Sequence, residues 1–92
     1  MNHFADPWFW ALYEKMPPTV RTAADKNFEL LKHNPSHPSL HFKKVGRYRS
    51  VRAGIKYRAL AVEAARDLLW FWIGNHKDYE TLLKNLNTGI QT

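Results

Sequence analysis

A run of six apolar residues, Leu68–Ile73, most restricts how this chain can fold. The run is far shorter than the roughly 20 residues that span a bilayer, and because it is apolar at every position both of its faces need cover. Gly74 then breaks the pattern. We therefore expect a central, covered β-strand. The 92 residues allow a single domain, residues 1–92, with one compact core.

The first third of the chain has the apolar pattern of two helices. Asp6-Pro7 is typical of a helix start, with Asp as the N-cap and Pro at the first helical position. Pro17-Pro18 ends this helix and begins a second one, which ends before Asn34-Pro35. The apolar residues at helical spacing are Phe9, Leu12, Tyr13 and Met16, then Val20, Ala24, Phe28 and Leu31. We predict a helical hairpin.

From Leu40 onwards apolar residues alternate with polar ones, which is typical of strands. The expected strands begin at Leu40, Tyr48, Tyr57 and Leu68. Their spacing of about ten residues predicts an antiparallel meander. The predicted class is α+β, with the N-terminal helical hairpin packed on a four-stranded antiparallel sheet and a short C-terminal helix after it.

The two ends of this predicted domain differ. Asn75 is a suitable cap for the C-terminal helix, and Asp78 suits its positive end. The apolar residues of that helix are Tyr79, Leu82, Leu83 and Leu86. Met1–Asp6 is too short and polar for a further strand, so we expect one edge of the sheet to be open.

The net charge of +6 is segregated along the chain, since no acidic residue lies between Glu29 and Glu63. The basic residues of that window are Lys32, Lys43, Lys44, Arg47, Arg49, Arg52, Lys56 and Arg58. One positive face suits a polyanion or an acidic protein segment, and the plain alternative is a solubilising surface. Met1–Phe9 lacks the features of a signal peptide, so we expect a cytoplasmic protein with no membrane partner.

Strand alternation directs Lys43, Arg52 and Arg58 away from the helices, and His76 and Tyr79 share a side of the last helix at the rim of that surface. Arg and Lys neutralise phosphate, His transfers protons near neutral pH, and Tyr stacks on a base or supports proton transfer. Such a set can cleave RNA without a metal. A base takes the 2′-hydroxyl proton, cations stabilise the phosphorane, and an acid protonates the 5′-oxygen.

Other kinds of site are excluded or disfavoured. The absence of Cys excludes thiolate zinc sites and disulfides. His33, His37 and His41 have the i, i+4, i+8 spacing of a helical metal site, but Pro35 and Pro38 forbid that helix. We therefore expect neither a metal nor a cofactor. Core packing is the preferred explanation for Trp8, Trp10, Trp70 and Trp72.

Several short motifs occur in a fixed order along the chain. They are Pro-Pro-x-Val-Arg at residues 17–21, the segment His37–Val45, Ser50-Val51-Arg52, Tyr57–Leu60 and Trp72–Tyr79. Together they resemble the RelE/ParE superfamily of small bacterial toxins over about residues 8–86. Each motif alone is weakly specific, and their order and spacing carry the resemblance.

The resemblance to the RelE, YoeB and HigB branch implies a toxin of a type II toxin–antitoxin system. Such toxins cleave mRNA, typically on the ribosome, without a metal, and an acidic antitoxin neutralises them. By position in the motifs, Arg58 matches the catalytic arginine, His76 the histidine of proton transfer and Tyr79 the tyrosine that holds or activates the substrate. The implied RNA-binding residues are Lys43, Lys44, Arg49, Arg52 and Lys56.

Two departures from the family pattern leave alternatives open. The initial strand of the family is expected to be absent, and no Glu lies among the basic strands to act as a general base, which leaves His76 or a Lys. One alternative is a ParE-like toxin that poisons DNA gyrase, and another is an inactive toxin-like module that binds an acidic partner. The open edge could pair with an antitoxin strand or with a second copy in a homodimer.

Overall fold

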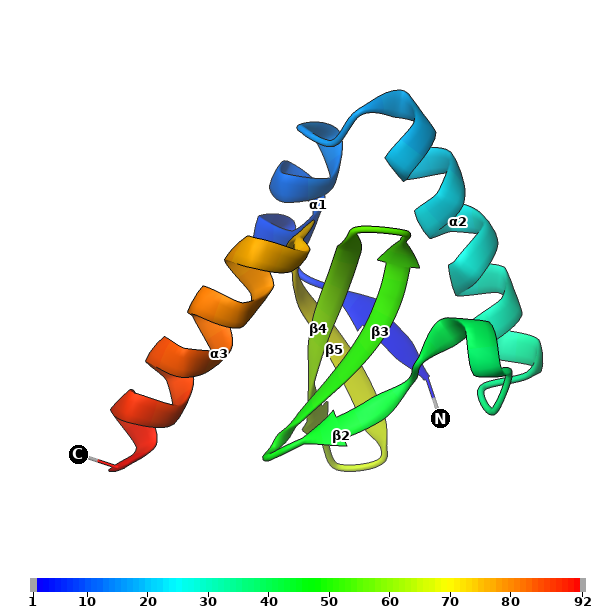
Figure 1. The fold of residues 1–92 in the computed structure, drawn as a ribbon. Coiled ribbons are helices and arrows are strands. Elements are labelled where there is room, and N and C mark those ends of the chain that lie inside the picture. Colours follow the sequence, from blue (N-terminus) through cyan, green and yellow to red (C-terminus); the bar gives the residue numbers. More distant parts are fainter. Residues whose placement is uncertain (1, 92) are drawn as a thin grey trace.

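The computed structural model describes residues 2–91, with side chains described as far as residue 86. Its elements are β1 (His3–Ala5), α1 (Pro7–Glu14), α2 (Pro18–His33), a 3₁₀ turn (Pro38–Leu40), β2 (Lys43–Val45), β3 (Tyr48–Gly54), β4 (Tyr57–Ala64), β5 (Asp67–Asn75) and α3 (His76–Gln91). The strands form one sheet in the order β1-β5-β4-β3-β2 (Figure 1). Within the described residues, no helix has the length and apolar character needed to cross a membrane.

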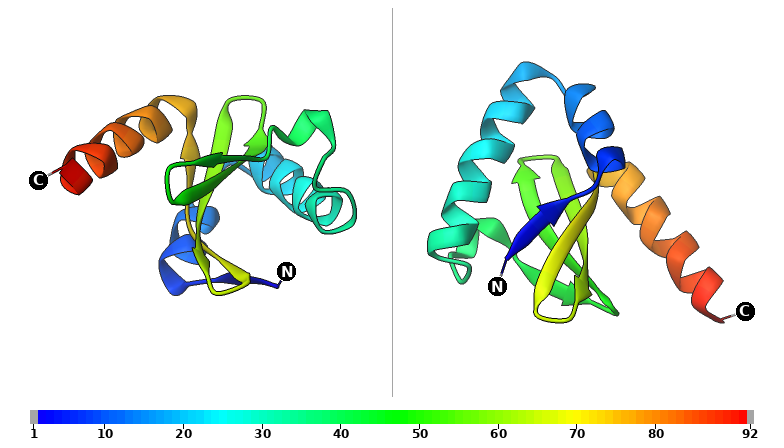
Figure 2. Two further views of the ribbon diagram at one scale, coloured as in Figure 1. Left: turned by 90° about the horizontal axis from the view of Figure 1, so that it is seen from below. Right: turned by 180° about the vertical axis from the view of Figure 1, so that it is seen from behind.

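The two faces of the sheet have different cover. The helices α2 and α3 lie on opposite sides of it (Figures 1 and 2). We call the side packed against α1 and α2 the hairpin face, and its strand residues include Val51, Ala53, Ala59, Ala61 and Ile73, all buried in the core. We call the other side the open face, and its strand residues are Lys43, Val45, Tyr48, Ser50, Arg52, Arg58, Leu60, Val62, Leu69, Phe71, Trp72 and Gly74. The helix α3 diverges from the sheet towards its C-terminal end (Figure 1).

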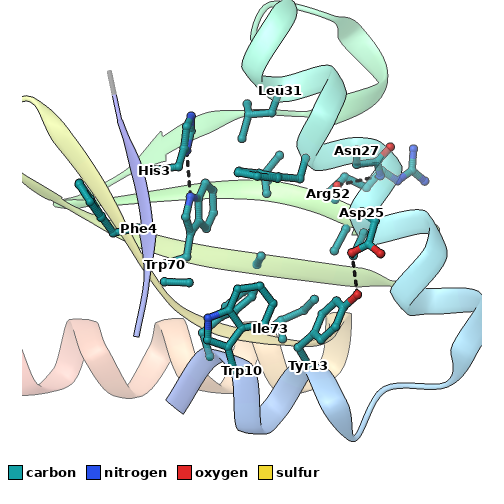
Figure 3. Close-up of a pocket in the computed structure, with 17 residues that line it drawn as sticks. His3, Phe4, Trp10, Tyr13, Asp25, Asn27, Leu31, Arg52, Trp70 and Ile73 are labelled. Carbon is teal, nitrogen blue, oxygen red and sulfur yellow. Dashed lines mark hydrogen bonds between the residues drawn. The ribbon is translucent and has the colours of Figure 1, made fainter. Parts of the chain in front are cut away.

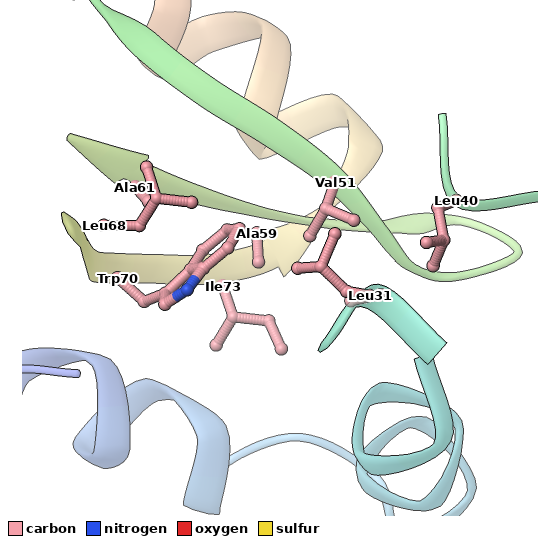
Figure 4. Packing of buried hydrophobic residues seen from close by; sticks show 9 residues of the cluster. Leu31, Leu40, Val51, Ala59, Ala61, Leu68, Trp70 and Ile73 are labelled. Carbon is pink, nitrogen blue, oxygen red and sulfur yellow. The ribbon is translucent and has the colours of Figure 1, made fainter. Parts of the chain in front are cut away.

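The main core lies between the hairpin face and α2 (Figure 4). Leu31 of α2 is 3% exposed, and Leu68 of β5, in the same cluster, is fully buried. Complete burial of such a side chain stabilises the fold by about 1.5–3 kcal/mol. Leu60 is also fully buried but lies on the open face, outside this cluster. The strand expected at Leu68–Ile73 lies inside the sheet with β1 and β4 as its neighbours. The expected cover of both its faces is wrong, because Leu69, Phe71 and Trp72 on the open face are partly exposed.

The helix boundaries follow from the capping residues that the sequence indicated. The Asp6 carboxylate accepts a hydrogen bond from the Phe9 backbone N–H at 2.8 Å, so α1 begins at Pro7. The Asn75 side-chain oxygen accepts from the Asp78 N–H at 2.7 Å and caps α3. The helix α2 begins at Pro18, as predicted. The helical hairpin and its two proline boundaries are confirmed.

The predicted open edge beside β5 is wrong, because a fifth strand, β1, fills it in parallel orientation. Only three residues long, β1 is held by contacts that a local pattern does not contain. The Trp70 indole N–H donates to Nδ1 of His3 at 3.0 Å, and the His3 ring meets the Phe28 ring edge-on at 5.4 Å between centroids. Backbone bonds from Leu68 N to Asn2 O and from Asp6 N to Trp70 O complete the attachment. A second copy or an antitoxin strand would now have to pair with the outer edge of β1.

Two other boundaries differ from the prediction. The strand expected at Leu40 begins only at Lys43, because Pro38–Leu40 forms a 3₁₀ turn. The His37 imidazole caps that turn by accepting from the Ser39 N–H at 3.2 Å. The C-terminal helix is not short, since α3 covers 16 residues, as many as α2.

The expectation that all four tryptophans are core residues is confirmed for Trp70 alone, since Trp72 is partly exposed on the open face, outside the core cluster. Trp70 is 5% exposed and belongs to the core, but Trp8 and Trp10 are 59% and 50% exposed. The eight-residue helix α1 has room for only one packed face, which Phe9 and Tyr13 occupy. The two tryptophans therefore lie on its outer sides.

Candidate nucleic-acid interface

Two arginines face each other across the open face. Arg52 of β3 and Arg58 of β4 are cross-strand partners. Among the described residues, neither has a carboxylate within salt-bridge distance, and their guanidinium groups donate only to the carbonyls of Ile55 (3.4 Å) and Tyr57 (2.9 Å). Like charges directly opposite each other destabilise a sheet. An anion between the two guanidinium groups would offset this repulsion.

The pKa of Arg58 and the hydrogen bonding of Arg52 both depend on the surroundings of this pair. Burial and then the charge of Arg52 lower the pKa of Arg58, while the Tyr79 phenol acts in the opposite direction. The Nε of Arg52 is buried and finds no hydrogen-bond partner within the described part of the chain. Because a buried donor without an acceptor is costly, a phosphate oxygen at this position would be stabilised.

The start of α3 lies beside the arginine pair. Arg58 is the cross-strand partner of Gly74, two residues before the helix. The His76 backbone N–H donates to the Lys56 carbonyl at 2.8 Å, which ties the helix start to the turn between β3 and β4. Strand pairing and this backbone bond thus place Arg52, Arg58, Lys56 and His76 in one region of the molecule.

The aromatic rings here are stacked on one another. The His76 and Tyr79 rings have centroids 5.7 Å apart, and Tyr79 also contacts Trp72 at 6.4 Å. Tyr79 is only 5% exposed, so its ring packs on the buried side of the His76 ring. The His76 side chain itself is half exposed. Trp72 lies over Gly74, where an added Cβ would come within 2.5 Å of the indole. Gly74 therefore leaves the space that this ring occupies.

A carboxylate that the sequence analysis missed stands next to the histidine. Glu80 Oε1 is 2.9 Å from His76 Nε2, at the i, i+4 spacing of one helix face. A carboxylate in this position orients the imidazole ring through a hydrogen bond. Helical spacing from His76 is the signal that could have identified Glu80, whereas the search for a Glu among the strands could not.

The remaining predicted binding residues divide between the two faces. Lys43 is the cross-strand partner of Ser50 and shares the open face with the arginine pair. Lys44 and Arg49 alternate to the other face, where Arg49 forms an ion pair with Glu63. The structure therefore does not bring Lys44 and Arg49 together with Arg58. No group of three His, Cys, Asp or Glu side chains suited to a metal occurs among the described residues.

The hairpin face carries a feature of a different kind, an apolar hollow of about 250 Å³ between α1, α2 and the sheet (Figure 3). Phe9 and Trp10 of α1, Phe28 of α2 and Trp70 of β5 line it. Several of its polar members are paired, since Tyr13 donates to Asp25 at 2.6 Å and Trp70 to His3. Arg52 also lines the hollow, and its backbone carbonyl accepts from the Asn27 side chain. An unfilled apolar hollow bordered by exposed aromatic rings suits an apolar segment of a partner.

No family model and no curated protein sequence matches the chain. Several solved structures do match the chain. A chain of the RelB–RelE antitoxin–toxin complex from Methanococcus jannaschii is 14% identical, with a TM-score of 0.67 over 86% of this chain and 96% of that one. The isolated Escherichia coli RelE toxin is 13% identical, with a TM-score of 0.59 over 92% and 97%.

A YoeB/ParE toxin from Agrobacterium tumefaciens is 14% identical, with a TM-score of 0.61 over 83% of this chain and 99% of that one. All three likenesses extend over nearly the whole of the compared chains, and at these identities they concern the backbone arrangement. The chain has the fold of the RelE, YoeB and ParE toxins.

Proposed function

We propose that this chain is the toxin of a toxin–antitoxin pair and that, as one cytoplasmic domain, it cleaves mRNA on the ribosome without a metal. The observation that carries the proposal is the pair Arg52–Arg58, which lacks an acidic partner among the described residues and lies beside His76 and its carboxylate Glu80. The fold shared with RelE and YoeB supports the same class of function.

In the proposed reaction the 2′-oxygen attacks the adjacent phosphorus while the bond to the 5′-oxygen breaks. The products are a 2′,3′-cyclic phosphate and a 5′-hydroxyl. Arg52 and Arg58 neutralise the charge that develops on the phosphoryl oxygens, which is the larger part of such catalysis. His76, oriented by Glu80, takes the proton of the 2′-hydroxyl and returns it to the leaving 5′-oxygen, and Tyr79 holds the His76 ring by stacking.

The proposed neutralising partner is an acidic antitoxin. RelB accompanies RelE in the structures from Methanococcus jannaschii and Pyrococcus horikoshii, which supports a partner of this kind. An amphipathic antitoxin segment has two complementary surfaces here, the basic open face for its carboxylates and the apolar hollow for its hydrophobic side chains.

The proposal is tested by primer extension on an mRNA translated by purified ribosomes, with wild-type protein and the variants Arg58→Ala and His76→Ala. We expect new 5′-hydroxyl ends within the coding region, reduced at least about 100-fold in either variant, a loss typical of one stabilising donor. Arg47→Ala is the matched control, because Arg47 is an exposed arginine in the β2–β3 turn, away from the pair.

Three outcomes would contradict the proposal. Intact mRNA from folded protein excludes the nuclease and leads to a gyrase cleavage assay for the ParE-like alternative. Ends that carry a 5′-phosphate exclude the 2′-hydroxyl route. Absence of growth arrest on expression supports the inactive binding module. One reason for that module no longer holds, because the initial strand is present as β1.

A further inference from the structure

The end of the open face away from the arginine pair carries two aromatic rings, Tyr48 and Phe71, with centroids 5.8 Å apart. Tyr48 belongs to β3 and Phe71 to β5, so the two rings meet across β4. Both side chains are partly exposed, as is Val62 of β4, the cross-strand partner of Tyr48. We call the Tyr48–Phe71 pair the aromatic platform.

A bulge in β5 places Phe71 on this face. Leu60 is the partner of Trp72 and Ala61 the partner of Trp70, so Phe71 is left without a cross-strand partner. Bulges redirect side chains, and this one lets Phe71 and Trp72 lie on the same side of the sheet. A regular strand would have turned one of these two rings into the opposite face.

The charges around the platform favour an anion. On the same face the strands present Lys43, Arg52 and Arg58. Among the described strand residues of this face the one carboxylate is Asp67, which lies at the end nearer the platform and accepts from the Asn2 N–H. Ser50 lies on β3 between the platform and the arginine pair. Its hydroxyl is buried and has no hydrogen-bond partner among the described residues.

We propose that the aromatic platform is a stacking site for one base of single-stranded RNA, next to the nucleotide whose phosphate lies between Arg52 and Arg58. Aromatic rings beside a basic groove bind any base through its π-face, and a polyanion with flat bases matches both halves of the surface. Tyr48 and Arg52 are four residues apart on one strand, which is a distance of about 13 Å. One RNA strand can therefore contact Arg52 with a phosphate and Tyr48 with the base of a neighbouring nucleotide. This inference rests on the proposed function.

The test measures fluorescence anisotropy of a labelled oligonucleotide of 2′-O-methyl RNA, which the protein cannot cleave, with a single abasic residue moved along it. Loss of the stacked base is expected to weaken binding by about 5- to 150-fold at one position of the oligonucleotide. Tyr48→Ala should weaken binding of the intact RNA by the same factor and remove the effect of the abasic residue. Tyr48→Phe keeps the ring and should bind as the wild type does.

Phe71→Leu is the second variant, since it keeps apolar cover over Leu60 while it removes the other ring. The double variant Arg52→Gln/Arg58→Gln should weaken all oligonucleotides alike. It should also reduce the slope of log K against log salt concentration by about 0.7, the value for the one phosphate held between the two arginines. If intact and abasic RNAs bind equally at every position, or if Tyr48→Ala binds like the wild type, the platform proposal fails while the proposed function stands. If the wild type binds no RNA, both fail.

Discussion

The two faces of the sheet differ at positions only one residue apart along the same strands. On the hairpin face Val51 opposite Ala59 joins the core, and one step further Arg52 faces Arg58 on the open face. The first pair contributes to stability through burial, whereas the second places two like charges together. The difference indicates that the hairpin face maintains the fold and that the open face is arranged for a ligand.

Removal of a core side chain from the hairpin face should produce the largest effect. Leu68 is fully buried, so Leu68→Ala is expected to lower the free energy of unfolding by about 2–5 kcal/mol, measured by urea denaturation. Ile55→Ala is the control, because Ile55 is 80% exposed and its loss should change stability by less than about 0.5 kcal/mol. Equal effects of the two substitutions would contradict the packing described for this face.

A smaller loss is expected from Gly74→Ala on the open face. Its new Cβ would lie 2.5 Å from the Trp72 indole, so the ring must shift away from Tyr79, at a cost of about 1–3 kcal/mol. Gly54→Ala is the matched control, because its nearest neighbour would be 3.7 Å away. We expect the control to be neutral or stabilising by up to about 1 kcal/mol in the same denaturation series. An unchanged tryptophan emission spectrum in Gly74→Ala would be evidence against the stacking.

Substitution of one arginine of the pair should raise stability. Arg58→Gln removes the like-charge contact with Arg52 and is expected to stabilise the protein by about 0.2–1 kcal/mol at low salt, with less effect at high salt. Arg21→Gln is the contrast on α2, because the Arg21 guanidinium donates to the carbonyls of Glu14 and Met16. That variant should lose stability. A loss in Arg58→Gln as well would mean that the arginine pair has a structural role.

The smallest effect concerns the attachment of β1 at low pH. Burial, and then nearby positive charges that include Lys32, lower the pKa of His3 from 6.5. The folded state therefore binds this proton less readily than the unfolded state does, so the stability contributed above pH 6.5 is lost as the pH falls towards the lowered pKa. Thermal unfolding between pH 8 and pH 5 should show a steeper decrease for the wild type than for His3→Gln. Identical slopes would contradict this assignment.

Much of the molecule could be predicted from local patterns. Asp6-Pro7 and Pro17-Pro18 define the hairpin, and alternation placed Arg52 and Arg58 on the surface away from it. The strand β1 could not be predicted in this way, because three residues with little strand character are held by Trp70, 67 residues after His3. The exposure of Trp8 depends on how much of a short helix the sheet can cover, which is a tertiary property.

Within the candidate site, some residue positions follow from local spacing in the sequence, and others depend on how the strands pair. His76 and Tyr79 are three apart on one helix, so their proximity follows from local spacing. Glu80 follows from the same spacing once His76 is chosen as the reference. The positions of Arg49 beside Glu63 and of Phe71 on the open face depend on strand register and on the bulge, which a single strand's sequence does not contain.

The most direct test of the division between the two faces is an NMR titration of isotopically labelled protein with a short 2′-O-methyl RNA that cannot be cleaved. We predict the largest backbone amide shifts at Arg52, Arg58 and the start of α3, with smaller shifts at Tyr48, and none along α1 and α2. Shifts that cluster on α1, α2 and the apolar residues lining the hollow, with the Arg58 amide and the start of α3 unchanged, would contradict the account.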